Sequence, residues 1–284
     1  MNAIELNHIH KSFGGFAIQD LSLTVPSGTI CGLVGENGAG KSTTIRLALG
    51  ALRPDSGAAA VLGTDVSSPA FTGVKEDVGV VLDEAYFPET LNALQVGKIL
   101  ASTYRQWEQG TYESYLDRFS LPVKKPFKDF SRGMKMKLAI TAALSHRPKL
   151  LVLDEATSGL DPIVRDEVLE IFNEFTREED HSILISSHIV SDLEKLCDYI
   201  AFLHQGRLLF CQEKDRLLED YGVFVGTAEQ AQSLLPEAVV GQEARDYGGV
   251  RALVKRGMVP ETLALERPTV EEIILFIVKG ENRR

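Results

Sequence analysis

The stretch TICGLVGENGAGKST, residues 29–43, decides the fold of this chain. It opens with an apolar run of strand length, and the residues from Lys41 to about Leu49 are typical of a helix. Between them lies GENGAGKST, which fits the pattern G-x-x-x-x-G-K-S/T with a strand before it and a helix after it. Glycines at this spacing let successive backbone N–H groups point at phosphate oxygens. The stretch therefore predicts an α/β fold that binds a nucleotide.

The residues of this loop have distinct expected roles. Lys41 reaches the β- and γ-phosphates as a positive charge, and Ser42 offers its hydroxyl to Mg²⁺. The N-terminus of the following helix adds its partial positive charge. The nucleotide contacts expected along the loop are Gly35, Glu36, Asn37, Gly38, Ala39, Gly40, Lys41, Ser42 and Thr43.

A phosphate loop needs a metal-holding acid at the end of a neighbouring strand, and LLVLDE at residues 150–155 supplies it. Four apolar residues predict a buried strand, and Asp154 follows at its carboxyl end, where ligands bind in open α/β sheets. We expect Asp154 to hold Mg²⁺ through water and Glu155 to orient or deprotonate the attacking water. A strand end followed by solvated acidic residues would give the same sequence pattern, but the phosphate loop upstream favours the metal site.

The segment FSRGMKMKL, residues 130–138, predicts the start of a helix with Ser131 as N-cap. Arg132, Lys135 and Lys137 follow in its first turns. Cations oppose the helix dipole at this end, which favours anions instead. We therefore expect an anion to bind at this helix N-terminus.

Composition narrows the classes of function. The chain has 284 residues, of which 44% are hydrophobic and 25% charged, with a net charge of -10. This is typical of a globular protein and argues against broad nucleic-acid binding. No apolar run reaches the roughly 18 residues of a membrane span, and the N-terminal MNAIELNHIHKSF lacks the apolar core of a secretory signal. Cys31, Cys197 and Cys211 form no metal or redox pattern, which favours a reducing cytosol.

Strand-like segments lie on both sides of a helical region. VGVVL at residues 78–82 precedes this region and LLVL at residues 150–153 follows it, while Gln205–Gly206 is expected to turn a hairpin. We expect a phosphate-loop α/β core with a β subdomain within residues 1–220, interrupted by a helical subdomain at about residues 85–147.

After about Tyr221 the composition changes, and residues 221–284 are expected to form a small α+β appendix. Thr269 and Glu272 predict a capping box at the start of a last helix, and Gly280 is expected to end that helix. An apolar stripe on this helix is formed by Val270, Ile273, Ile274 and Ile277.

Four motifs in series resemble the ATP-binding-cassette (ABC) ATPases: GENGAGKST, FSRGMK, LLVLDEATSGLD and the His188 of ISSH. The resemblance covers about residues 1–215. In that family two cassettes pair head to tail, and each ATP lies between the phosphate loop of one chain and the signature motif of the other. The resemblance implies that Ser131 and the backbone at Gly133 contact the γ-phosphate of an ATP held by a partner, which is the expected anion.

The resemblance also implies roles for residues outside the loop. Asp161 in SGLD matches a loop that crosses the dimer interface, and His188 matches a histidine that touches the γ-phosphate. Phe13 matches an aromatic residue that stacks on adenine, with Ile18 as its apolar neighbour. On residue type alone, Phe13 fits a core position and His188 an exposed loop, so these roles rest on the resemblance. The implied cofactors are ATP and Mg²⁺.

The chain departs from the family pattern at several positions. Asp83, followed by Glu84, stands where the family has a glutamine that senses Mg²⁺ and the attacking water. A carboxylate ligates Mg²⁺ more strongly than an amide but adds negative charge beside the γ-phosphate, and we expect Asp83 to contact both metal and nucleotide. Ala156 replaces a proline, and Arg132 and Met134 replace Gly and Gln of the signature. Arg132 is either a phosphate contact or a solvated side chain.

These departures, with SGLDPI and the tail PTVEEIILFIVKG, resemble bacterial exporters of antimicrobial or amphipathic peptides, of the bacitracin-resistance, Ytr and phenol-soluble-modulin types. They imply an ATPase subunit that pairs with a second ATPase subunit, expected to be a second copy of itself, around two ATP molecules. A separate membrane permease would dock on the helical subdomain near residues 83–100. The complex would lie at the cytoplasmic face of the bacterial cell membrane.

Alternatives stay open at this point. A soluble cassette ATPase acts on ribosomes or DNA in some relatives, but those carry two cassettes or long coiled coils, so no nucleic-acid partner is expected here. An exporter of this type can also carry another cargo. Residues 221–284 are expected to brace a dimer, with a ligand-sensing regulatory domain as the alternative.

Overall fold

The computed structural model of the protein describes residues 1–83 and 86–281, so Glu84 lies outside the described residues. The chain forms two compact units: Met1–Ile189 with Tyr199–Cys211, and Val190–Asp198 with Gln212–Arg284. The sequence predicts one boundary, after residue 220, whereas the second unit takes in residues 190–198 and resumes at residue 212. Among the described residues, no helix combines the length and apolarity needed to cross a membrane.

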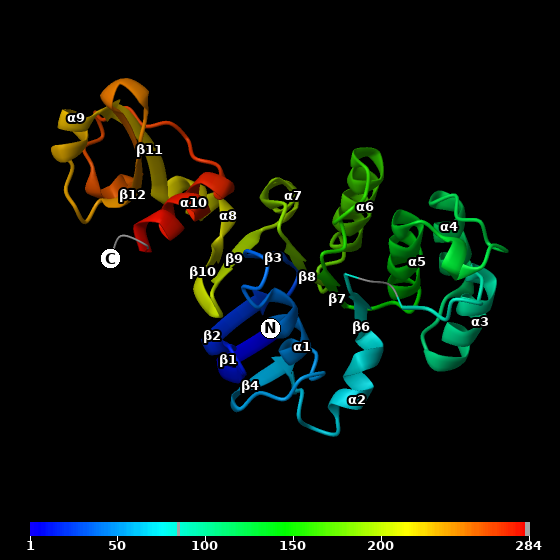
Figure 1. The fold of residues 1–284 in the computed structure, drawn as a ribbon. Helices are drawn as coiled ribbons and strands as arrows, with labels where there is room; N and C mark the ends of the chain where they lie inside the picture. Colours follow the sequence, from blue (N-terminus) through cyan, green and yellow to red (C-terminus); the bar gives the residue numbers. More distant parts are fainter. Residues whose placement is uncertain (84–85, 282–284) are drawn as a thin grey trace. The chain divides into compact units, whose positions relative to one another are not determined.

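The first unit is built on a six-stranded sheet (Figure 1). In spatial order its strands are β10 (Arg207–Glu213), β9 (Tyr199–His204), β3 (Ile30–Val34), β8 (Ser182–Ser187), β7 (Leu150–Asp154) and β6 (Val78–Val81). Strands β3, β7 and β8 are buried along their whole length, as expected of apolar runs covered on both faces. The parallel register sets Asp154 opposite Ser186 and Val34 opposite Ser187, so the carboxyl ends of these strands meet at one edge.

A second, antiparallel sheet of the first unit lies beside helix α1 (Lys41–Ala48). Its strands, in order, are β2 (Phe16–Pro26), β1 (Asn2–Phe13), β4 (Ser56–Val61) and β5 (Thr64–Asp65). Leu6 of β1, Leu33 of β3 and Ile45 of α1 belong to one hydrophobic core. This shared core fixes the strand–loop–helix unit between the two sheets.

A helical region lies between β6 and β7, as the sequence predicts. It contains α3 (Ala93–Thr103), α4 (Gln109–Arg118), the 3-10 turn η2 (Phe127–Asp129) and α5 (Arg132–Leu144). The three α-helices pack side by side (Figure 1). The hydroxyl of buried Tyr112 on α4 donates to the Ala93 carbonyl at the start of α3, at 2.8 Å. The first unit also contains α2 (Phe71–Val74), η1 (Lys75–Asp77) and α6 (Pro162–Phe175).

The second unit is a small α+β structure. Its antiparallel sheet has the order β11 (Tyr221–Thr227), β13 (Gly249–Lys255) and β12 (Val239–Ala244). Its other elements are α7 (Val190–Leu196), α8 (Lys214–Asp220), α9 (Ala228–Gln232), η3 (Asp246–Gly248), η4 (Arg256–Met258) and α10 (Val270–Glu281). The backbone N–H of Val270 donates to the Glu194 carboxylate at 3.1 Å, which ties α10 to α7. This contact explains why residues 190–198 belong to the second unit.

The ends of α10 confirm one prediction and correct another. The capping box is present, because the Thr269 N–H donates to Glu272 Oε2 at 3.0 Å and the Glu272 N–H donates to Thr269 Oγ1 at 3.2 Å. Gly280, expected to end the helix, lies inside it. A Cβ on Gly280 would lie 2.1 Å from the Val240 carbonyl oxygen. The glycine therefore serves a close approach of α10 to β12 rather than a helix stop.

Candidate functional site

The phosphate loop has the backbone conformation that its glycines predict. Gly38 and Gly40 have φ values of 83° and 111°, in the left-handed region that other residues avoid. A Cβ on Gly40 would lie 2.6 Å from Ile18 Cδ1, and one on Gly35 would lie 2.5 Å from the Leu203 carbonyl oxygen. Both conformation and packing therefore require glycine here.

Lys41, the first residue of α1, lies back over this loop. Its ammonium donates to the carbonyl oxygens of Gly35 at 2.7 Å and Glu36 at 3.3 Å, and it lies 3.5 Å from Glu155 Oε1. The side chain is only 7% exposed. A buried ammonium with carbonyl partners and one carboxylate is a cation fixed at the mouth of the loop.

Asp154 and Glu155 sit at the carboxyl end of β7, as predicted. Asp154 is buried, and its Oδ1 accepts a hydrogen bond of 2.5 Å from the hydroxyl of Ser186 on β8. Glu155 follows in a left-handed conformation with φ 53°. That backbone turn carries its side chain towards the phosphate loop instead of continuing the strand.

Glu155 joins the predicted catalytic residues into one cluster. Its Oε1 faces Lys41, and its Oε2 lies 2.6 Å from His188 Nδ1. The Glu155 side chain is 15% exposed and that of His188 is 49% exposed. Three residues taken from separate motifs therefore meet at one edge of the sheet.

A cavity of about 620 Å³ opens at this cluster. Besides the cluster, its lining includes Ser42, Thr43 and Asp83. Ala39 of the loop is buried, and buried Ile18 lies against Gly40. The other residues that line the cavity are Phe16, Glu36, Asn37, Gly38, Gly40, Arg132 and Ser158.

A pair of phenylalanines, Phe13 and Phe16, lies at or beside one side of the cavity, and the adenine contact expected of Phe13 stays a prediction. Phe16 lines the cavity, while Phe13 lies outside that lining with 44% of its surface exposed. The two rings stack with centroids 6.3 Å apart, because Phe13 and Phe16 are cross-strand partners around the β1–β2 turn. The sequence signal that could have found Phe16 is its place directly after Gly14-Gly15.

Ser131, Gly133 and Asp161 are not brought to the phosphate loop of their own chain. Ser131 caps α5 by accepting from the Met134 N–H at 3.2 Å, which confirms the predicted N-cap. Asp161 caps α6 in the same way, accepting from the Val164 N–H at 3.1 Å. None of the three lines the cavity described above.

Arg132, which the sequence predicts as either a phosphate contact or a solvated side chain, lines the cavity together with Asp83. It is exposed, and its guanidinium lies against Gly159, since a Cβ on Gly159 would be 3.1 Å from the guanidinium carbon. The signature residue thus reaches the SGLD loop of the same chain. Arg132 and Asp83 thus bring opposite charges to the lining of one cavity.

The residues expected to hold Mg²⁺ offer oxygen donors, which this cation prefers. The donors are the Ser42 hydroxyl and the Asp83 and Asp154 carboxylates. The Ser186 hydroxyl donates to Asp154 Oδ1. Within residues 1–83 and 86–281, no hydrogen bond reaches the other oxygen, Oδ2. The same residues contain no cluster of three His, Cys, Asp or Glu side chains suited to a metal. Because Mg²⁺ prefers six oxygen ligands and usually keeps several waters, a Mg²⁺ held by these three side chains would take its other ligands from phosphate oxygens and water.

The chain is similar in sequence and fold to known proteins. The ABC transporter family matches residues 18–158, from the second strand to the segment after Glu155. The chain is 32% identical to the ABC transporter ATP-binding protein YtrB of Bacillus subtilis, over 77% of this chain and 74% of YtrB. It is 34% identical to the bacitracin transport ATP-binding protein BcrA of Enterococcus faecalis, over 72% of this chain and 68% of BcrA.

A solved structure of the ATP binding subunit of an ABC transporter has the same fold. It superposes with a TM-score of 0.69 at 28% identity, covering 76% of this chain and 92% of that one. The resemblance drawn from the four motifs and the phosphate-loop α/β fold are both confirmed. The chain therefore belongs to the ABC transporter family, as an ATP-binding protein that hydrolyses ATP.

Proposed function

We propose that the chain hydrolyses ATP at the Lys41–Glu155–His188 cluster and so drives export of antimicrobial or amphipathic peptides through a separate membrane permease. The hydrolytic site is supported by the contacts that bring these three side chains together beside the phosphate loop. The peptide cargo is supported by the likeness to BcrA, a bacitracin transport protein.

In the proposed reaction Glu155 accepts a proton from the water that attacks the γ-phosphate. His188 holds the Glu155 carboxylate on one side, and Lys41 approaches it on the other. The Lys41 ammonium exchanges a loop carbonyl for a phosphate oxygen when nucleotide binds. Mg²⁺, held by Ser42 and Asp154 with Asp83 nearby, would neutralise charge on the β- and γ-phosphates.

A second copy of the chain is proposed to complete each site. Ser131 and Asp161 are exposed at the N-termini of α5 and α6, where the helix dipole favours anions. Neither lines the cavity of its own chain. This placement supports head-to-tail pairing, in which Ser131 and Gly133 face the γ-phosphate of the partner's ATP.

The permease is proposed to dock on the helical subdomain. A groove of about 300 Å³ lies between β6 and helices α3 and α5. Tyr86, Leu94 and Ile99 around this region are 75%, 37% and 49% exposed. Exposed apolar side chains around a groove are typical of a protein interaction surface. Tyr86, Phe87 and Leu100 of its lining fall within residues 83–100, where docking was expected. Binding there would place the chain at the cytoplasmic face of the membrane. It is lined by Val80, Val81, Leu82, Tyr86, Phe87, Leu100, Tyr104, Ala139, Ala142, Ala143 and His146.

Residues 221–284 remain proposed as a dimerisation element. The apolar stripe of α10, which suggested this role, is largely covered inside the second unit, where Phe276 is buried along with Val270, Ile273 and Ile274. Leu275 of α10 and Val225 of β11 stay 51% and 41% exposed. A brace between copies would therefore use these two side chains, and charge substitutions at both should weaken association if the proposal holds.

Co-purification tests the transporter proposal. The chain is used to pull down multispan membrane proteins from a membrane extract of its own cells, and the complex with the captured protein is reconstituted in lipid vesicles. We expect a stable complex whose ATPase rate rises severalfold with a bacitracin-like cyclic peptide or an amphipathic helical peptide. Stimulation by a different class of solute would keep the proposed ATPase role and show that the cargo is not a peptide. Association with ribosomes or DNA in place of a membrane protein would contradict the proposal.

A further inference from the structure

Ser186 contacts both acids of the site at once. Its hydroxyl donates to Asp154 Oδ1 at 2.5 Å and accepts from the backbone N–H of Glu155 at 3.1 Å. The Ser186 carbonyl oxygen also accepts from that N–H, at 3.1 Å. A serine hydroxyl has one hydrogen to donate and lone pairs to accept, so these contacts use both of its capacities. The side chain is fully buried.

The two contacts act on different parts of the site. The bond to Oδ1 fixes the rotation of the Asp154 carboxylate and leaves Oδ2 without a hydrogen bond from any described residue. The bond to the Glu155 N–H fixes the turn after β7, where Glu155 has the uncommon φ of 53°. That turn is what brings the Glu155 carboxylate to Lys41 and His188.

We propose that Ser186 is a positioning residue for ATP hydrolysis: its hydroxyl turns Asp154 Oδ2 towards Mg²⁺ and holds Glu155 in line with the attacking water. The inference rests on the roles proposed above for Asp154 and Glu155. Residues that orient metal ligands and catalytic groups from behind are typical of metal-dependent sites. Ser186 itself touches neither nucleotide nor water in this proposal.

The next residue is the natural comparison. Ser187 is the same residue type, lies on the same strand and is also fully buried. Its hydroxyl accepts from the Ile189 N–H at 3.0 Å and has no hydrogen bond to either acid. If burial of a serine at the end of β8 were all that mattered, both positions would respond alike to substitution.

The test compares Ser186→Thr with Ser186→Val, which match in volume and differ in the hydroxyl. The readouts are kcat and KM for Mg²⁺-ATP, and the affinity for a fluorescent ATP analogue with Mg²⁺ and with EDTA. We expect the valine variant to lose about tenfold to a hundredfold in kcat relative to threonine. We also expect it to lose most of the gain in affinity that Mg²⁺ provides, while binding in EDTA stays unchanged.

Ser186→Ala, which needs no extra room, is compared with Ser187→Ala in case the larger residues prevent folding. Equal kcat and equal Mg²⁺ response in each pair would overturn the inference. Turnover that survives Glu155→Gln, in a chain that keeps Ser186, would instead overturn the proposed catalytic role of Glu155. The two failures are therefore distinguishable, because the second is read without any change at Ser186.

Discussion

Two largely buried cations, one in each unit, are held in different ways. Lys41 in the first unit has two loop carbonyls as partners and approaches Glu155 only to 3.5 Å. Arg251 in the second unit lies among three glutamates and donates to Glu272 at 2.7 Å. Lys41 borders a cavity of about 620 Å³, so a phosphate can replace one of its partners. Arg251 has its charge already matched by the protein itself.

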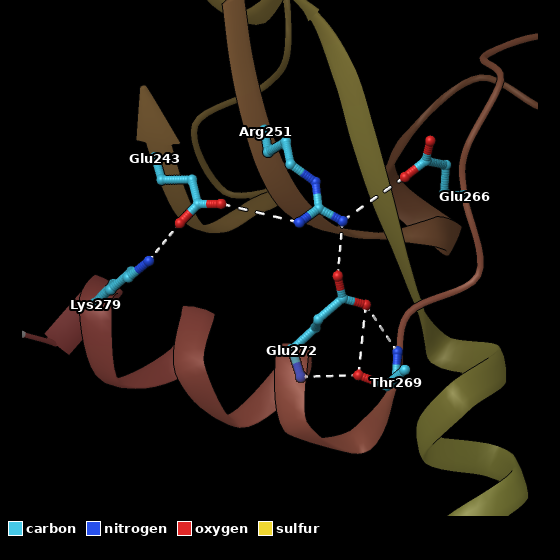
Figure 2. Close-up of polar contacts among 6 residues, drawn as sticks. All are labelled: Glu243, Arg251, Glu266, Thr269, Glu272 and Lys279. Carbon is cyan, nitrogen blue, oxygen red and sulfur yellow. Dashed lines mark hydrogen bonds and ion pairs between the residues drawn. The ribbon is translucent and has the colours of Figure 1, made fainter. Parts of the chain in front are cut away.

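Figure 2 shows how the second arrangement connects the elements of that unit. Arg251 on β13 joins Glu272, which caps α10 through Thr269, and it lies 3.7 Å from Glu266. At the other end of α10, Lys279 pairs with Glu243 of β12. Both ends of the helix are therefore tied to the sheet by charge. A buried cation whose partners a ligand can replace serves a binding site, as Lys41 does. A buried cation whose charge is matched by the protein, such as Arg251, joins elements of the fold.

Glu155→Gln breaks the first arrangement. The amide cannot accept the proton of the attacking water, so turnover should fall by at least about a hundredfold while ATP binding is kept. We expect the variant to form a dimer with ATP and Mg²⁺, seen by light scattering. Glu170→Gln, an exposed acid on α6, is the control and should keep its activity. A monomeric Glu155→Gln chain under these conditions would count against the paired cassette.

Arg251→Met breaks the second arrangement. Glu272 and its neighbours would lose their main cation, at a cost of about 1–3 kcal/mol to the second unit. Hydrogen exchange of β11, β12 and β13 should speed up, and Trp107, the single tryptophan, reports separately on the first unit. Arg216→Met removes an exposed arginine of the same unit and serves as control. Unchanged hydrogen-exchange rates in the sheet would show that Arg251 does not stabilise the packing of α10 on the sheet.

How much of this was predictable depends on the distance in sequence over which each feature is set. The phosphate loop was predictable because the strand, the glycines and Lys41 are contiguous. Ser186 was not, because its role follows from the register that sets β8 opposite Asp154. The sequence around Gly280 predicts a helix stop, because the Val240 carbonyl that Gly280 approaches is distant in sequence. Arg251 gave no signal, since its acids are spread from Glu243 to Glu272.

Arg132 and Asp83 offer a finer test of the first arrangement. Both line the same cavity, and the Arg132 guanidinium lies against Gly159. If Arg132 offsets the extra negative charge of Asp83, Arg132→Ala should slow turnover by about fivefold to tenfold. Asp83→Gln should then recover part of that loss in the double variant, because the charge to be offset is gone. Four ATPase rates form the cycle, and effects that simply add would contradict the coupling.

A buried histidine of the first unit, unlike Lys41 and Arg251, carries no charge. His146 in the first unit is 1% exposed. Its ring stacks on Tyr104 with centroids 4.0 Å apart, and its Nδ1 lies 3.0 Å from the Glu76 carbonyl oxygen. Burial lowers the pKa of His146 below its ordinary value of 6.5, although Glu76 and Asp77 nearby act in the opposite direction. This group is therefore kept uncharged, unlike Lys41 and Arg251.

The sign of its pH effect follows from linkage. Above about pH 6.5 the ring is neutral in both the folded and the unfolded chain, and the full stability is present. As the pH falls, the unfolded chain takes up the proton first, so stability decreases until the pH has passed the lowered pKa of the folded state. Urea unfolding followed by Trp107 fluorescence at pH 7.5 and 5.5 should show a smaller loss of stability in His146→Phe than in the wild type. His10→Gln, which removes an exposed histidine, should keep the wild-type loss, and an equal loss in His146→Phe would mean that burial of this ring is not what couples stability to pH.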